Sequence, residues 1–170
     1  TLLFTDNVIS TPSQVIVRRS ALKKTDGFHK PLIDINAHYD DFFLWLELSL
    51  LGPFVFLPNP LIHYRRHSEA GSLNQNADFG RLLGRFYICN KLKETIKKRN
   101  DPHLSSAYHS LFYETSMTLG WFCRQKQKHS IAINAYIQAI RLNPLSINAW
   151  IRLFVSISNK IFSYQSSSID

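Results

Sequence analysis

The sequence predicts an α+β region followed by an all-helical region. Before residue 76, short β-branched and aromatic runs alternate with Pro and Gly, a pattern typical of strands joined by turns. After residue 77, apolar residues recur at every third or fourth position, which predicts successive amphipathic helices. With 170 residues, 45% of them hydrophobic, the chain suits one or two small domains with cores.

The first region is expected to combine strands with two helices. A helix is predicted at 20–24, ended by Asp26-Gly27, and a second one at about 40–51, ended by Gly52-Pro53. Three strands are predicted, at 14–17, 54–57 and 61–65.

The second region is expected to hold four helices and a short tail. The apolar spacing places the helices at about 77–98, 104–124, 130–142 and 146–159, with a Ser-rich, frayed end from 164. The predicted organisation is therefore residues 1–76, residues 77–162 and a disordered tail at 163–170.

The net charge of +8 lies entirely in the second region. Residues 1–76 hold seven Lys/Arg and seven Asp/Glu, whereas the remainder holds thirteen and five. A basic helical surface suits anionic lipid head groups or another polyanion. Solvated, Lys-rich helix faces explain the same asymmetry, so both interpretations stay open.

Three further features concern the cellular setting. Cys89 and Cys123 match no metal or redox spacing and are expected to be buried thiols, compatible with a reducing compartment. No apolar run approaches the about 20 residues that span a bilayer. Because Thr1 begins what resembles the middle of a domain, we expect the chain to be a piece of a longer protein.

The helical region carries a repeat pattern. Leu and Gly are adjacent, small and aromatic residues follow at fixed distances, and a Pro and a Trp close the unit: Leu119, Gly120, Ala132, Tyr136, Ala139, Pro144 and Trp150. This pattern resembles a tetratricopeptide repeat over about residues 113–153. Ser116, Cys123 and Phe154 depart from it. The resemblance implies a protein-binding segment, and a purely structural helical cap is the alternative.

The candidate chemistry of the first region centres on two adjacent carboxylates. Asp40 and Asp41 precede the run Phe42-Phe43-Leu44-Trp45-Leu46, where a helix is expected to start. Acidic side chains are favoured at helix N-termini, so an ordinary helix cap is one interpretation. A carboxylate presented into a cleft is the other.

Two further stretches accompany this pair in a definite order. The segments TPSQVIVRRSALKKTDGF, YDDFFLWLEL and LPNPLIHYRRH follow one another within about residues 12–68. In this order they resemble the acceptor half of the inverting glycosyltransferases of family 2, which have a GT-A fold. The resemblance implies that the first region is the C-terminal part of a GT-A α/β domain.

The resemblance also implies roles for individual residues. Asp41 corresponds to the catalytic base, with Asp40 in the place of the family's Glu, and Trp45 either packs in the core or lines the acceptor site. A base is required because the acceptor hydroxyl loses its proton as it attacks the sugar. Arg65 and His67 fall near the nucleotide diphosphate, with His67 a candidate ligand of a divalent Mg or Mn ion. A surface basic cluster is the alternative for these two.

The donor-binding part of the family lies N-terminal to this region. No Asp-x-Asp suited to a metal diphosphate is present, and Asp34-Ile35-Asn36 is a poor substitute. We therefore expect the isolated chain to bind donor weakly and to be almost inactive.

The implied partners are a nucleotide-sugar donor and a glycan or lipid-linked acceptor. A protein partner on the repeat-like helices and peripheral contact with a membrane are further expectations. A cytoplasmic location, at the inner face of a membrane, goes with this function. A repeat-type interaction module with a non-catalytic first region is the competing hypothesis. A third hypothesis is that the chain binds a polyanion, and no nucleic-acid-binding motif in the sequence supports it.

Overall fold

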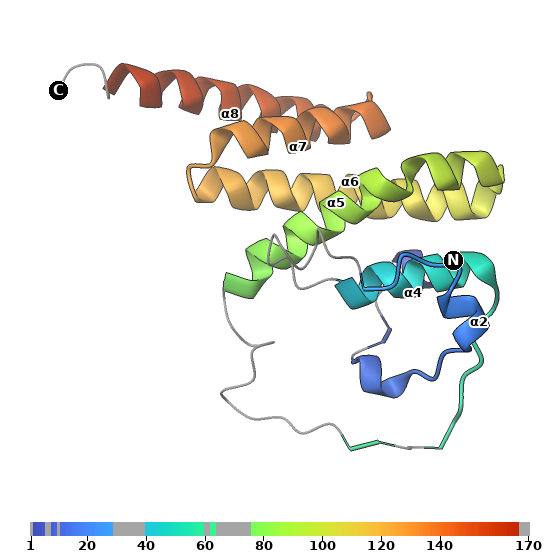
Figure 1. The fold of residues 1–170 in the computed structure, drawn as a ribbon. Helices are drawn as coiled ribbons and strands as arrows, with labels where there is room; N and C mark the ends of the chain where they lie inside the picture. The colour runs from blue at the N-terminus through green and yellow to red at the C-terminus, as the bar shows by residue number, and fades with distance from the viewer. Residues whose placement is uncertain are drawn as a thin grey trace. The chain divides into compact units, whose positions relative to one another are not determined.

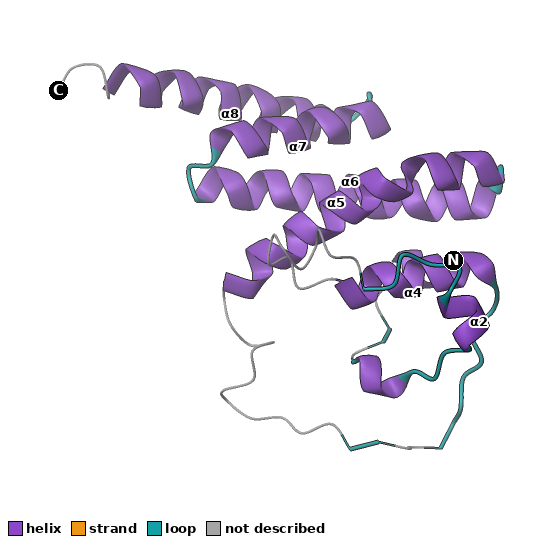
Figure 2. Ribbon diagram, in the orientation of Figure 1, coloured by secondary structure: helices purple, strands orange, loops and turns teal. Residues whose placement is uncertain are grey.

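A computed structural model describes residues 2–5, 8–9, 11–28, 40–59, 62–63 and 76–166. The chain divides into two compact units, residues 1–84 and 85–170, and their border falls within one helix. Figures 1 and 2 show the elements, which are helices throughout the described part of the chain. They are α1 (Leu2–Thr5), η1 (Pro12–Gln14), α2 (Arg19–Leu22), α4 (Asp40–Leu51), α5 (Asn76–Arg99), α6 (Pro102–Gln125), α7 (His129–Leu142) and α8 (Ile147–Ser166).

The prediction of an α+β fragment of a GT-A domain was wrong, because the described residues form no strand. Gln14 belongs to the 3-10 helix η1, and its side-chain Oε1 accepts the backbone N–H of Thr11 at 3.3 Å. Val15 is extended, with φ −122° and ψ 132°, but extended backbone becomes a strand only when a neighbouring strand pairs with it.

The other two predicted strands were expected at residues 54–57 and 61–65. Residues 54–57 form an exposed loop after α4, in which Val55 and Phe56 are 84% and 86% exposed. Of the strand predicted at 61–65, only residues 62 and 63 are described, and they are not in a strand. Apolar, β-prone composition alone therefore misled the prediction, since it does not specify a pairing partner.

The core of the first unit is built around α4, which spans the residues predicted for it. Five consecutive residues, 42–46, are each at most 2% exposed, so this part of the helix is buried all round rather than along one stripe, whereas Glu47 and Leu51 are partly exposed. Helices α1 and α2 both contact α4, and Leu3 and Phe4 of α1 are buried.

A tight turn after α2 is attached to α4. Gly27 has φ +67°, a left-handed conformation that glycine adopts without steric cost. The backbone N–H of the preceding Asp26 donates a hydrogen bond to Glu47 Oε2 at 3.0 Å. The turn at Asp26-Gly27, where the first predicted helix was expected to end, is therefore hydrogen-bonded to the middle of α4.

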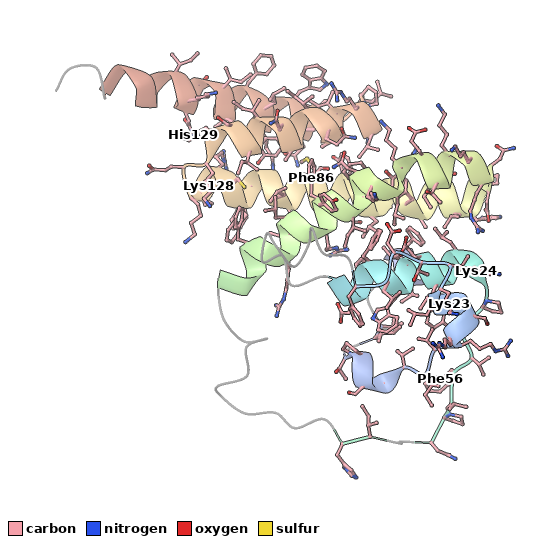
Figure 3. The ribbon with its side chains drawn as sticks, viewed as in Figure 1. Lys23, Lys24, Phe56, Phe86, Lys128 and His129 are labelled. Atoms are coloured by element: carbon pink, nitrogen blue, oxygen red, sulfur yellow. The ribbon has the colours of Figure 1, made fainter. Side chains whose placement is uncertain are left out.

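In the second unit, the last part of α5 packs against α6. Phe86 points from α5 toward α6 (Figure 3), and its ring lies 5.6 Å from that of Phe112. The Tyr108 hydroxyl donates to the Cys89 carbonyl at 2.8 Å, which satisfies a polar group inside the contact. This aromatic contact and hydrogen bond join α5 to α6, and Cys89, Tyr108 and Phe112 are buried in the contact, whereas Phe86 is partly exposed.

A sharp corner separates α5 from α6. Asn100 takes a left-handed conformation, with φ 51°, that ends α5. Asp101 then caps α6, and its Oδ1 accepts the backbone N–H groups of His103 at 3.0 Å and Leu104 at 3.1 Å. Pro102 occupies the first helical position, where its missing N–H costs nothing.

Helices α6, α7 and α8 form a consecutive stack in which α7 contacts both neighbours (Figure 1). A Cβ added to Gly120 would lie 2.6 Å from Tyr136 Cε1, so α6 and α7 approach as closely as a glycine allows. Helix α8 continues to Ser166, past the predicted end near 159, so residues 164–166 are helical and not frayed. Residues 167–170 lie outside the described part of the chain.

Both cysteines are buried thiols, as predicted. Burial raises the pKa of Cys89 to about 12, while the charge of Arg85 opposes this rise. Burial likewise raises the pKa of Cys123. The two thiols therefore stay protonated near neutral pH.

Candidate functional site

Asp41 lies in the first turn of α4 and is only half-buried, whereas the five residues that follow it are buried. Its Oδ1 accepts the backbone N–H of Phe42 at 2.7 Å. Unpaired N–H groups and the helix dipole stabilise negative charge at this end of a helix. The carboxylate therefore sits on a firmly packed support and keeps partial access to the surroundings.

Of the other predicted site residues, two lie in α4 and two lie outside the described part of the chain. Asp40 begins α4 beside Asp41. Arg65 and His67 lie outside the described residues, so the structure does not relate them to Asp41. Trp45 is 2% exposed and lies in the core of the first unit, where its Nε1–H has no hydrogen-bond partner among the described residues. A buried, unpaired donor of this kind costs about 1–3 kcal/mol.

Metal ligands do not gather in the described ranges. Within these ranges no group of three or more His, Cys, Asp or Glu side chains is placed to hold a metal ion. The candidate metal ligand His67 lies outside them. The predicted divalent cation thus remains an expectation that rests on the resemblance.

The second unit has a hollow that the sequence patterns did not predict. Met117, Thr118 and Trp121 of α6 and Arg152 of α8 line a cavity of about 260 Å³. Trp121 is 44% exposed, and Arg152 Nε donates to Asn148 Oδ1 at 2.9 Å, which anchors the guanidinium to α8. An apolar wall and a cation therefore lie together between α6 and α8.

A signal for this hollow exists in α6. The buried stripe of this helix runs through Ser116, Leu119, Gly120 and Cys123, while Met117 and Trp121 are offset from it by one position. Large apolar residues beside a buried stripe face a shared surface rather than the core. The contribution of Arg152 was not predictable, because it depends on how α8 crosses α6.

Tyr136 lies under the α6–α7 contact and is fully buried. Burial raises the pKa of its phenol, and the positive charges of Arg152 and Arg124 oppose that rise. Among the residues that line the hollow, Arg152 carries a charge, and its guanidinium can pair with an anionic group of a ligand.

Comparisons of the chain with protein-family models, with curated proteins and with solved structures found no match. In the part of the chain that the structure describes, no helix is both long and apolar enough to cross a bilayer. In the part of the chain that the structure describes, the elements are helices, with Asp40 and Asp41 in the first turn of α4 and a hollow lined by apolar side chains and Arg152 between α6 and α8.

Proposed function

We propose that the chain is the acceptor-side portion of an inverting glycosyltransferase in which Asp41 is the general base. The acceptor hydroxyl oxygen attacks the anomeric carbon of a nucleotide sugar, and the bond from that carbon to the diphosphate oxygen breaks. The hydroxyl proton passes to the Asp41 carboxylate, and the nucleotide diphosphate leaves with the bonding electron pair. One in-line displacement inverts the anomeric centre, so no protein nucleophile takes part.

The observation that carries this proposal is the setting of Asp41. A general base must be held within hydrogen-bond reach of the proton that it removes, and its support must therefore be rigid. The residues that follow Asp41 are almost fully buried, while Asp41 itself is half-buried. This contrast supports a carboxylate that is held on a firmly packed helix and is partly exposed.

A second contact supports the motif order on which the resemblance rests. The Asp26-Gly27 turn of the first motif is hydrogen-bonded to Glu47 of the motif that contains Asp41. Two stretches that are separated in the sequence are therefore in contact, because the turn at Asp26 is hydrogen-bonded to α4. The proposal concerns the chemistry of Asp41 and requires no sheet within this chain.

The remaining roles follow from the resemblance. Asp40 takes the place of the family's Glu, Arg65 neutralises the departing diphosphate, and His67 is a candidate metal ligand. A nucleotide sugar, with Mg or Mn, and a glycan or lipid-linked acceptor are the proposed substrates. Because no metal-holding group exists among the described residues, no step is assigned to a metal. The two buried thiols support a cytoplasmic location.

The test replaces Asp41 by Asn in the longer protein that includes the donor-binding half. Nucleotide release from a panel of nucleotide sugars is measured with and without acceptor extract. Asp41→Asn should lower the turnover rate by about 10²–10⁴-fold, because the amide cannot take the proton. Asn keeps a side-chain oxygen that can accept the Phe42 N–H, so the melting temperature should stay close to that of the parent.

A matched control is Asp26→Asn, which changes an exposed carboxylate in the adjoining turn and leaves the backbone hydrogen bond to Glu47 in place. This variant should retain the parent rate. Equal rates for Asp41→Asn and the parent would show that Asp41 is not the base.

A second candidate function, protein binding by a tetratricopeptide-type segment, is favoured by the α6–α7 contact. A Cβ at position 120 would lie 2.6 Å from Tyr136 Cε1, so any side chain larger than that of Gly requires a shift, and Leu119, Ala132 and Ala139 are fully buried. Trp150 Nε1 donates to the Pro144 carbonyl at 2.9 Å, which fixes the turn into α8. The pattern residues of α6 and α7 thus occupy buried packing positions, as a helical hairpin of this type requires, whereas Trp150 is 42% exposed.

The hollow lined by Trp121 and Arg152 is the proposed contact surface for such a partner. An array of peptides that pair acidic with apolar residues is probed with the full chain. Trp121→Ala and Arg152→Gln should each weaken the peptide signals by about tenfold, since interface Trp and Arg residues often dominate binding energy. Ile16→Ala, at a 92% exposed position of the first unit, is the control. Peptide signals that survive both changes would exclude this surface.

A further inference from the structure

Helix α8 has two apolar faces. One packs on α7 through Ala149, Leu153 and Ser156, which are 0%, 8% and 0% exposed. The opposite side, here called the outer face, also carries apolar residues at helical spacing, and each is more than a third exposed. The outer face consists of Ile147, Trp150, Ile151, Phe154, Ile157 and Ile161. An exposed apolar stripe of this kind marks an interaction surface.

The charge of the surrounding segment indicates what covers the outer face. Residues 115–169 contain six Lys/Arg and no Asp or Glu. The second unit as a whole, residues 85–170, holds twelve basic and four acidic residues, whereas the first unit holds eight of each. The outer face itself has no charged side chain. Its occupant should therefore combine an apolar interior with negative charge nearby.

Two other occupants are disfavoured. Phe154 stands 34 residues after Gly120, at the position equivalent to it in the repeat pattern. Gly120 permits the α6–α7 approach, so a phenylalanine at the equivalent position prevents another helix from packing as closely on α8. A second copy would bring two units of the same strong positive charge together, which costs electrostatic free energy.

We infer that the outer face of α8 binds to an anionic lipid surface, with the helix lying in the plane of the interface. Phe154, Ile151 and Ile161 would enter the boundary between head groups and acyl chains, and Trp150 would sit at the head-group level. The excess of Lys and Arg side chains in the second unit would supply long-range attraction to anionic lipids. This inference is independent of the sugar-transfer proposal.

The experiment measures co-sedimentation of the full chain with vesicles. One preparation is phosphatidylcholine alone, and the other is phosphatidylcholine mixed with phosphatidylglycerol. Binding to the anionic vesicles should be at least about tenfold tighter, and it should weaken strongly when salt rises from about 0.1 M to about 1 M. The double variant Ile151→Ser/Phe154→Ser should bind anionic vesicles about tenfold more weakly than the parent.

Matched controls come from exposed apolar positions of the first unit. Ile16→Ser and Val55→Ser remove residues that are 92% and 84% exposed and should leave vesicle binding unchanged. All these positions are exposed, so the melting temperature of each variant should match that of the parent.

Three results would overturn the inference. The first is absence of binding to anionic vesicles by the folded parent. The second is equal binding to both vesicle types, which would remove the role of the basic residues. The third is a dimer in light scattering that Ile151→Ser/Phe154→Ser dissociates while vesicle binding persists, which would assign the outer face to a second copy.

Discussion

Substituting Gly120 by Ala tests the packing of α6 on α7. In an exposed helix this change stabilises by about 0.5–1 kcal/mol, because Ala loses less conformational entropy than Gly. At position 120 the added Cβ would lie 2.6 Å, 2.7 Å and 2.9 Å from three atoms of the Tyr136 ring. Atoms this close must separate, and the ring is fully buried, so it has no open space to enter.

The magnitude follows from these opposing effects. Overpacking a dense interior costs about 1–3 kcal/mol, and three short contacts place this case in the upper half of that range. After subtraction of the helix-propensity gain, the free energy of unfolding should fall by about 1–2 kcal/mol. For a unit of this size, that corresponds to a melting temperature lower by about 4–16 °C.

The assay is urea and thermal unfolding followed by circular dichroism at the helical band. Gly52→Ala is the control, because a Cβ there meets no atom within 4 Å, and it should be neutral or slightly stabilising. In the double variant Gly120→Ala/Tyr136→Leu, the smaller side chain should recover part of the loss, giving a coupling free energy of about 1 kcal/mol. A Gly120→Ala protein at least as stable as the parent would refute the reasoning.

Two further predictions concern the second unit. Asp101→Ala removes the side-chain oxygen that accepts the N–H groups of His103 and Leu104, so the free energy of unfolding should drop by about 1 kcal/mol. Asp101→Asn keeps an acceptor oxygen and should lose much less. Equal losses for the two variants in denaturant titrations would exclude a capping role. Because burial raises the pKa of Cys89 to about 12 from its ordinary 9.0, the unfolded thiol ionises above pH 9 while the native thiol stays protonated. Stability should therefore be unaffected by this group below pH 9 and decline between pH 9 and 12, more steeply for the parent than for Cys89→Ala, and parallel curves would contradict the assignment.

The helices were predictable from the sequence because their signals are local. Apolar spacing located α4, α5, α6 and α7 to within about two residues, although the cap at Asp101-Pro102 starts α6 two residues before the predicted 104. Helix α8 was underestimated at its C-terminal end, where Ile161 continues the apolar period beyond Asn159. Periodicity defines a helix better than it defines where the helix stops.

The strands were not predictable, because a strand depends on a partner at a distance along the chain. Residues 54–57 are as apolar and β-prone as many strands, yet in the structure they form an exposed loop. The candidate site likewise has one feature that local sequence determines and one that depends on tertiary contacts. The placement of Asp41 in the first turn of α4 followed from local pattern, whereas its relation to His67 requires tertiary contacts that the sequence does not encode locally.

The burial of residues 42–46 of α4 has a consequence for exchange with solvent. Amide protons in the middle of this helix, around Leu44–Leu46, should exchange with deuterium only when the whole first unit opens, since no partial opening exposes them. Amides of the 54–57 loop should exchange within the shortest labelling times. The segment that follows Asp41 would then be the slowest-exchanging part of its unit. A ligand that binds near the Asp41 carboxylate would contact a surface that is already ordered before binding.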